Sequence, residues 1–289
     1  MSCMAEIRIR NLLEELHKMR LSIITINRNN AEGLRKTIES IFAQTNRDFE
    51  YIIVDGASFD GSVEIIKEFA QTLENGEWRL ENFMWSSEPD TGIYNAMNKG
   101  LKKAHGEYTL MLNSGDYLVD EYVVERVLSQ LDGTDIIQGN VISTCAGKET
   151  LNRGYGKSDI TFIDVMKGHF LHQASFCRRE LFGKYGYFDE SYKINGDTVF
   201  YAKCLGFGDA TFKYVNLNIA YYDMSGISAD PNGRWVALRK EEDEWYAQLF
   251  SKRMWDLYYK EERKIKLYDK LHKHKWSWNL TMLISKMIK

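Results

Sequence analysis

Four short apolar runs, separated by helical patterns, constrain the fold of this chain more than any other feature. The runs are rich in Ile, Val, Leu and aromatic residues, as buried strands are, and they cover residues 21–26, 49–54, 83–85 and 108–112. Apolar residues recur at helical spacing between them, for example Leu34, Ile38 and Ile41 after the first run. Strand and helix therefore alternate, which predicts an α/β fold with a mostly parallel, Rossmann-like sheet flanked by helices.

Polar side chains follow each of these predicted strands. In open parallel sheets, ligands bind beyond the carboxyl ends of the strands, so these residues are expected to line a common site. The alternative is that they only form turns, because Asn, Gly and Asp end strands for conformational reasons alone. The residues are Thr25, Asn27 and Arg28 at the first run, Asp55 at the second, Glu88 and Asp90 at the third, and Asn113 and Asp116 at the fourth.

The residues at these strand ends narrow the kind of ligand. The first run lacks the G-x-G-x-x-G that a dinucleotide site requires, which disfavours a nicotinamide or flavin cofactor. Acidic strand ends suit a nucleotide diphosphate that a metal bridges to the protein. Asp55 would then accept a hydrogen bond from the base or ribose, and Asp116 would reach the diphosphate through Mg²⁺ or Mn²⁺, which prefer oxygen ligands.

Several segments together resemble family 2 glycosyltransferases, and the likeness extends over about residues 20–225. The segment from Ser87 to Gly100 (SEPDTGIYNAMNKG) resembles the branch that builds bacterial exopolysaccharides and other surface glycans. The resemblance implies a GT-A fold, a nucleotide-sugar donor, a divalent metal and inversion at the anomeric carbon. The segments that carry it are residues 21–29, 54–62, 87–100 and 112–116.

The resemblance also implies roles for individual residues. Asp197 matches the carboxylate that activates the acceptor, and the alternative for it is a helix cap. His172, in a His-Gln pair, is expected to contact the diphosphate or acceptor, or else to be a core histidine. Asn95, Lys99 and Arg28 are expected at the donor, the two cations facing phosphate unless they are only solvated.

The metal corner departs from the family pattern. The usual acidic D-x-D appears here as Asn113-Ser114-Gly115-Asp116, which leaves one carboxylate. Asp116 alone is therefore the expected metal ligand, with Asn113 as an auxiliary.

The second half of the chain is less regular. A helix is expected over residues 117–131, a strand over 135–144, and a polar, glycine-rich loop near the sugar over 146–157. His169 and His172 are placed on a strand, where a spacing of three residues puts them on opposite faces.

The predicted organisation has three parts. Residues 1–19 form an N-terminal helix, and residues 20–225 the catalytic domain, with a nucleotide-sugar half over about 20–117 and an acceptor half over 118–225. Residues 226–289 form a helical, basic and aromatic extension.

Charge is distributed unevenly along the chain. The net charge is −3, but residues 252–289 contain 11 Lys and Arg against 4 Asp and Glu, and several Trp, Met and Ile. Such a segment suits the surface of an anionic membrane, or alternatively packs on the acidic body. The four cysteines are widely spaced and the first 20 residues lack a signal-peptide pattern, so a cytoplasmic protein, peripheral on the inner membrane, is expected.

These observations predict an enzyme that transfers a hexose from a nucleotide diphosphate sugar to a glycan or lipid-linked acceptor in surface polysaccharide biosynthesis. No nucleic-acid partner is expected. Two alternatives stay open: a catalytically silent relative that binds glycan or a partner, and a sugar nucleotidylyltransferase. The latter would want a glycine-rich basic loop after the first strand, whereas this chain has Asn27-Arg28-Asn29-Asn30.

Overall fold

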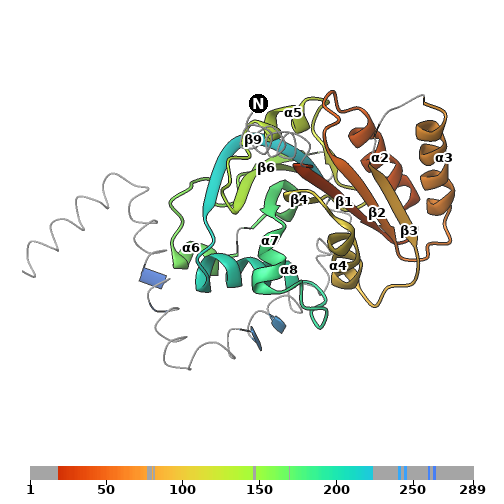
Figure 1. Cartoon of the computed structure of the whole chain (residues 1–289). Helices are drawn as coiled ribbons and strands as arrows, with labels where there is room; N and C mark the ends of the chain where they lie inside the picture. Colours follow the sequence, from red (N-terminus) through yellow and green to blue (C-terminus); the bar gives the residue numbers. More distant parts are fainter. Residues whose placement is uncertain are drawn as a thin grey trace, which may run out of the picture. The chain divides into compact units, whose positions relative to one another are not determined.

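The computed structural model describes residues 19–76, 80, 82–145, 148–168 and 170–223, together with residues 240, 241, 244, 245, 260, 263 and 264. The predicted N-terminal helix and nearly all of the C-terminal extension lie outside these residues. The described residues form a nine-stranded sheet in the order β3-β2-β1-β4-β8-β6-β9-β5, with β7 paired to β6 (Figure 1).

The first half of the sheet is parallel, as the alternating pattern predicts. It consists of β1 (Leu21–Asn27), β2 (Glu50–Asp55), β3 (Phe83–Ser87) and β4 (Tyr108–Met111). The crossover helices are α2 (Ala31–Phe42), α3 (Ser62–Glu74) and α4 (Ile93–Lys103). Leu34 of α2 and Ile66 of α3 are buried in one apolar cluster, and Met97 of α4 is buried in another. The two clusters cover opposite faces of the sheet.

The second half of the sheet is mixed. Strand β8 (Ser175–Arg178) is antiparallel to both β4 and β6 (Ile136–Cys145), and β9 (Phe212–Asp223) is parallel to β6. The remaining strands are β5 (Tyr117–Leu118) and β7 (Lys148–Asn152). The helical elements are α5 (Val123–Leu128), α6 (Phe162–Met166), the 3-10 turn η1 (His172–Ala174), α7 (Glu180–Tyr185), α8 (Gly196–Ala202) and the π-helical turn η2 (Lys203–Phe207).

Three local predictions are wrong. The segment 117–131 begins as strand β5 and is helical only in α5. The segment 146–157 is not simply a loop, because its residues 148–152 form β7 on the edge of β6. His172 lies in the turn η1 rather than on a strand, and His169 lies outside the described residues.

The chain divides into two compact units, Met1–Arg234 and Trp235–Lys289. Among the described residues, no helix combines the length and apolar character that a membrane crossing requires.

Candidate active site

The carboxyl ends of β1, β2 and β3 lie side by side. Asn27 pairs in register with Asp55, and Asp55 with Ser87. The chain leaving β4 stays beside β1, since the N–H of Ser114 donates to the carbonyl of Ile26 at 3.0 Å. The sheet therefore brings polar residues from all four strand ends to one edge, as predicted.

Asp55 is a fully buried carboxylate whose oxygens already accept four hydrogen bonds. Oδ1 accepts from Asn27 Nδ2 at 2.8 Å and from the Ser58 hydroxyl at 2.6 Å. Oδ2 accepts from the Ser58 N–H at 2.9 Å and from the Ser87 hydroxyl at 2.6 Å. Burial alone would raise the pKa of Asp55, but these donors outweigh it and the pKa is lowered. Asp55 is thus an ionised, rigidly held hydrogen-bond acceptor. A nucleoside would have to donate to Asp55 in addition to the hydroxyls of Ser58 and Ser87, or in their place.

The two cations predicted to face phosphate each have an acidic neighbour. Arg28 lies 3.7 Å from Asp90, and Lys99 lies 3.4 Å from Glu88 while donating to the carbonyl of Pro89 at 2.8 Å. Asp90 packs so closely on the loop after β2 that a Cβ at Gly56 would lie 2.2 Å from its Oδ2. The Arg28 side chain is 64% exposed. Both cations therefore lie near the strand ends, where each now faces a carboxylate of the protein. To bind a phosphate, each would have to turn from that carboxylate or contact both groups.

Thr25 is placed differently from the prediction. Its side chain is buried within the sheet, where its hydroxyl donates to the carbonyl of Leu112 at 2.8 Å and accepts from Tyr51 at 3.0 Å. The prediction that Thr25 contacts the donor is corrected accordingly, because this side chain joins β1 to the chain after β4.

The corner after β4 is held by helix α2. The Thr37 hydroxyl donates to the carbonyl of Asp116 at 2.7 Å and accepts from the N–H of Gly115 at 3.0 Å. Gly115 has φ of 102°, a left-handed conformation that other residues rarely adopt. The turn chemistry predicted at this corner is therefore real, and it presents Asn113 and Asp116 together.

The side chains of this corner fit a divalent metal. Asp116 is buried, and the amide oxygen Oδ1 of Asn113 is buried without a hydrogen-bond partner among the described residues. Nowhere in the described ranges do three or more His, Cys, Asp or Glu gather as metal ligands. One carboxylate and one amide oxygen are nevertheless a donor set that Mg²⁺ or Mn²⁺ uses when phosphate oxygens and water complete the shell.

His172 links this corner to Asp197. Its Nε2 lies 3.4 Å from Asn113 Nδ2, and its Nδ1 lies 3.0 Å from Asp197 Oδ2. Burial alone would lower the pKa of His172, but the hydrogen bond and charge of Asp197, with the charge of Asp116, raise it. Burial would raise the pKa of Asp197, but His172, the N–H of Thr198 and the Tyr94 hydroxyl lower it. The pair is thus a partly buried, charge-assisted contact between the turn η1 and the first turn of α8.

Helix α4 contributes three side chains to this region, two of which sequence reasoning missed. Tyr94 donates to Asp197 Oδ1 at 3.0 Å, and Asn98 donates to Glu190 at 2.9 Å. Asn95, predicted at the donor, donates to Glu190 Oε2 at 2.8 Å. The only available signal was their place in the segment Ser87–Gly100, which had the most specific family likeness.

Comparison with known proteins places this geometry in a class. The structure is similar to residues 1–349 of TarS from S. aureus, with a TM-score of 0.59 and 19% identity over 71% of this chain and 61% of that fragment. It is also similar to the mannosyltransferase PcManGT from Pyrobaculum calidifontis, with a TM-score of 0.52 and 18% identity over 74% of this chain and 58% of that one. The fold is therefore the GT-A fold, as expected.

The sequence comparison then identifies the family. The model of glycosyl transferase family 2 matches residues 22–205. A PGL/p-HBAD biosynthesis glycosyltransferase from Mycobacterium bovis is 31% identical over 208 residues, which are 71% of this chain and 77% of the relative. The chain belongs to glycosyl transferase family 2. Neither the silent relative nor the nucleotidylyltransferase is favoured by these matches.

Proposed function

We propose that this protein is an inverting glycosyltransferase that moves a hexose from a nucleotide diphosphate sugar to a glycan or lipid-linked acceptor in surface polysaccharide biosynthesis. One observation carries the proposal. A partly buried carboxylate, Asp197, is connected through His172 to Asn113 in the corner that also carries Asp116. A base and a diphosphate-binding corner are the two parts that the reaction needs, and here a single histidine spans them.

The reaction assigns each part a task. The acceptor oxygen attacks the anomeric carbon while the bond from that carbon to the diphosphate oxygen breaks, and Asp197 takes the proton of the acceptor hydroxyl. The lowered pKa of Asp197 keeps it ionised, and therefore able to accept, at neutral pH. The diphosphate leaves as an anion, so no carboxylic acid has to protonate it.

The metal and donor would be held at the strand ends. Asp116 and Asn113 are the residues that would hold Mg²⁺ or Mn²⁺, which when bound neutralises charge on the departing diphosphate. Asn27 and Asp55 would meet the nucleoside, and Arg28, Lys99, Glu88, Asp90, Asn95 and His172 complete the proposed surroundings of the donor. In support, TarS has been crystallised with UDP-GlcNAc, and PcManGT with GDP-Man and Mn²⁺.

A lipid-linked acceptor has support of another kind. A cholesterol galactosyltransferase from Borreliella burgdorferi is 31% identical over 124 residues, which are 42% of this chain and 32% of that protein. Its name states a lipid acceptor and a hexose. The basic segment 252–289 would bind the membrane that contains such an acceptor and so keep the enzyme close to it. The proposal therefore includes a cytoplasmic location at the inner membrane surface.

Calorimetric titration with a panel of nucleotide diphosphate sugars, with and without Mn²⁺, tests the donor site. We expect metal-dependent binding that Asp116→Ala abolishes and that the exposed control Asp132→Ala leaves unchanged. Asp197→Asn should retain donor binding and lose transfer. If no donor binds under any condition, the proposed glycosyltransferase activity is refuted. If Asp197→Asn retains transfer, Asp197 is not the base and its role is that of a helix cap.

A further inference from the structure

Tyr94, the second residue of α4, lies directly against the start of α8. The side chain is buried, at 3% exposure, and its ring faces Gly196. A Cβ at position 196 would lie 2.8 Å from Cε2 and 2.9 Å from Cδ2 of this ring. A glycine is therefore needed at the first residue of α8, beside Asp197, because the aromatic ring occupies the space of a side chain.

The hydroxyl of Tyr94 has two acceptors on the same loop. It donates to Asp197 Oδ1 at 3.0 Å and also to the carbonyl oxygen of Ile194. Burial and the negative charge of Asp197 raise the pKa of Tyr94, so the phenol stays protonated and acts as a donor. A phenol has a single proton, which these two acceptors must share.

Asp197 is consequently held from two sides by two different elements. Tyr94 of α4 contacts Oδ1, and His172 of η1 contacts Oδ2. A carboxylate contacted on both oxygens cannot rotate without losing a hydrogen bond. With the N–H of Thr198 as a third donor, the carboxylate still has a lone pair for an incoming hydroxyl, because each of its oxygens accepts about two hydrogen bonds.

We propose that Tyr94 is the positioning residue for the base: its ring on Gly196 fixes the start of α8, and its hydroxyl orients the Asp197 carboxylate toward the acceptor. This inference rests on the proposed function of Asp197. During transfer the acceptor's proton moves to Asp197 and no proton leaves Tyr94. The phenol proton can then turn to the Ile194 carbonyl, so the Tyr94 hydroxyl keeps a hydrogen-bond acceptor when the carboxyl group is neutral.

Tyr94→Phe tests the hydroxyl, because it retains the ring on Gly196. We expect kcat for transfer to fall about tenfold, less than the roughly 10²- to 10⁴-fold that a general base contributes because the base itself remains, while the donor Kd measured by calorimetry stays unchanged. If Tyr94 had only a structural role, Tyr94→Phe would lower the stability of the fold but would not lower kcat while leaving the donor Kd unchanged.

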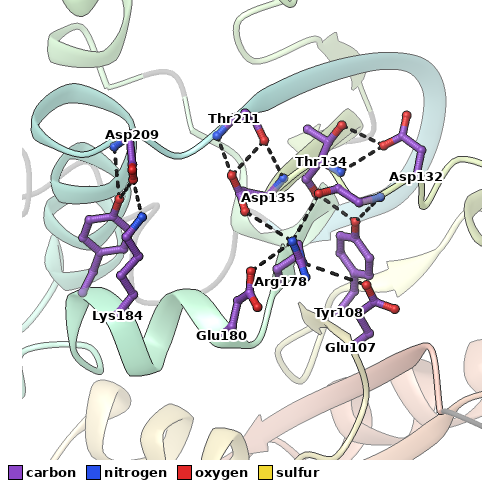
Figure 2. Close-up of polar contacts among 12 residues, drawn as sticks. Glu107, Tyr108, Asp132, Thr134, Asp135, Arg178, Glu180, Lys184, Asp209 and Thr211 are labelled. Atoms are coloured by element: carbon purple, nitrogen blue, oxygen red, sulfur yellow. Dashed lines mark hydrogen bonds and ion pairs between the residues drawn. The ribbon is translucent and has the colours of Figure 1, made fainter.

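Tyr108→Phe is the matched control. Tyr108 is equally buried, at 1% exposure; its hydroxyl donates to the carbonyl of Thr134 at 2.9 Å and accepts from the N–H of Gly133 at 3.0 Å. It begins β4, at the opposite end of that strand from Asn113, and it lies beside Thr134 (Figure 2). We expect a similar shift of the melting temperature from Tyr108→Phe and an unchanged kcat.

Gly196→Ala tests the ring contact without removing any polar group. The new methyl group must displace the Tyr94 ring, so kcat should fall while the donor Kd stays unchanged. In the double variant with Tyr94→Phe, kcat should fall by less than the product of the two single fold-changes, because both substitutions disturb the same contact. If Gly196→Ala does not fold, Tyr94→Phe decides alone.

The outcomes separate the two proposals. A kcat within twofold of wild type in Tyr94→Phe, with transfer abolished in Asp197→Asn, overturns the positioning role and leaves the base in place. An equal fall in Tyr94→Phe and Tyr108→Phe also overturns it. Retained transfer in Asp197→Asn overturns the proposed base, and the positioning role with it.

Discussion

Three carboxylates show how one residue type serves different tasks in this molecule. Asp55 accepts from hydroxyl and N–H donors, whereas Glu50 and Asp197 each also lie beside a histidine ring, that of His105 and of His172. All three have lowered pKa values, so a lowered pKa alone does not identify the base. What distinguishes Asp197 is where its histidine lies: His172 also contacts Asn113 at the strand ends, whereas His105 beside Glu50 is 74% exposed.

Glu50 is the anchoring case, and its effect should depend on pH. It is 2% exposed and accepts from the N–H of Gly106 at 2.9 Å, from the Ser22 hydroxyl, and from the N–H of His105. Its pKa is lowered from 4.5, since these donors outweigh the effect of burial. Ionised Glu50 therefore stabilises the fold above about pH 4.5, and the stabilisation is lost as the pH falls through the lowered value.

We accordingly expect Glu50→Gln to lower the free energy of unfolding by about 1–3 kcal/mol at pH 7, and by less as the pH falls below 4.5. Urea unfolding of the full chain at several pH values measures this. Glu68→Gln is the control, because the Glu68–Arg35 pair is exposed and should contribute little. A loss that is equal at pH 7 and pH 3 would assign the effect to packing instead of charge.

At the scale of elements, α4 joins the first half of the sheet to the segment before α8. Asn98 donates to the carbonyl of Phe188 at 2.8 Å and accepts from its N–H at 3.1 Å, as a neighbouring strand would. The Phe188 ring packs on Tyr94 of α4, Phe182 of α7 and Phe200 of α8. The loop that leads to Asp197 is thus fastened to a helix of the other half.

Asn98→Ala should release this loop. Two buried backbone groups of Phe188 would lose their partner, at a cost of about 2 kcal/mol or more, and kcat should fall because the segment 188–197 shifts. Gln44→Ala is the control: this buried amide fastens residues 120–124 by contacts to Asp120 and Val124. Chemical unfolding and steady-state kinetics on both variants should show similar losses of stability, and a fall in kcat for Asn98→Ala only.

The elements also show why sequence predicted some parts and not others. Strands β1 and β2 are buried along their length and mostly apolar, so their pattern is visible locally. Strand β7 is exposed at every residue and owes its existence to backbone pairing with β6, for which the sequence carries no apolar signal. The strand-end residues were predictable from their position, whereas the contact of Tyr94 with Asp197 spans 103 residues and no local pattern indicates it.

At the scale of the whole molecule, the site lies where the two halves of the sheet meet. Strand β4 is parallel to β1 on one side and antiparallel to β8 on the other. The corner with Asn113 and Asp116 follows β4, and the turn with His172 directly precedes β8. One change of strand direction therefore brings this corner and the histidine together, and makes the second half of the sheet necessary for the candidate site.

The uneven charge gives the remaining prediction. Residues 252–289 carry a net +7 from 11 basic and 4 acidic residues, so the rest of the chain carries −10. Basic residues near an anionic surface contribute about 1 kcal/mol each, and tryptophans partition into the interface. We expect the full chain to co-sediment with vesicles containing anionic lipid, and to do so less in high salt or with neutral vesicles.

A chain ending at Ser251 should lose this binding, and Trp276→Ala with Trp278→Ala in the full chain should weaken it without changing the charge. Kinetics with a water-soluble acceptor controls for folding, because the proposed site lies entirely before residue 251 and kcat should be unchanged. If the shortened chain co-sediments as well as the full chain, the basic segment does not bind the membrane. Packing on the acidic body would then be the better account of its charge, since opposite charges at such a contact attract.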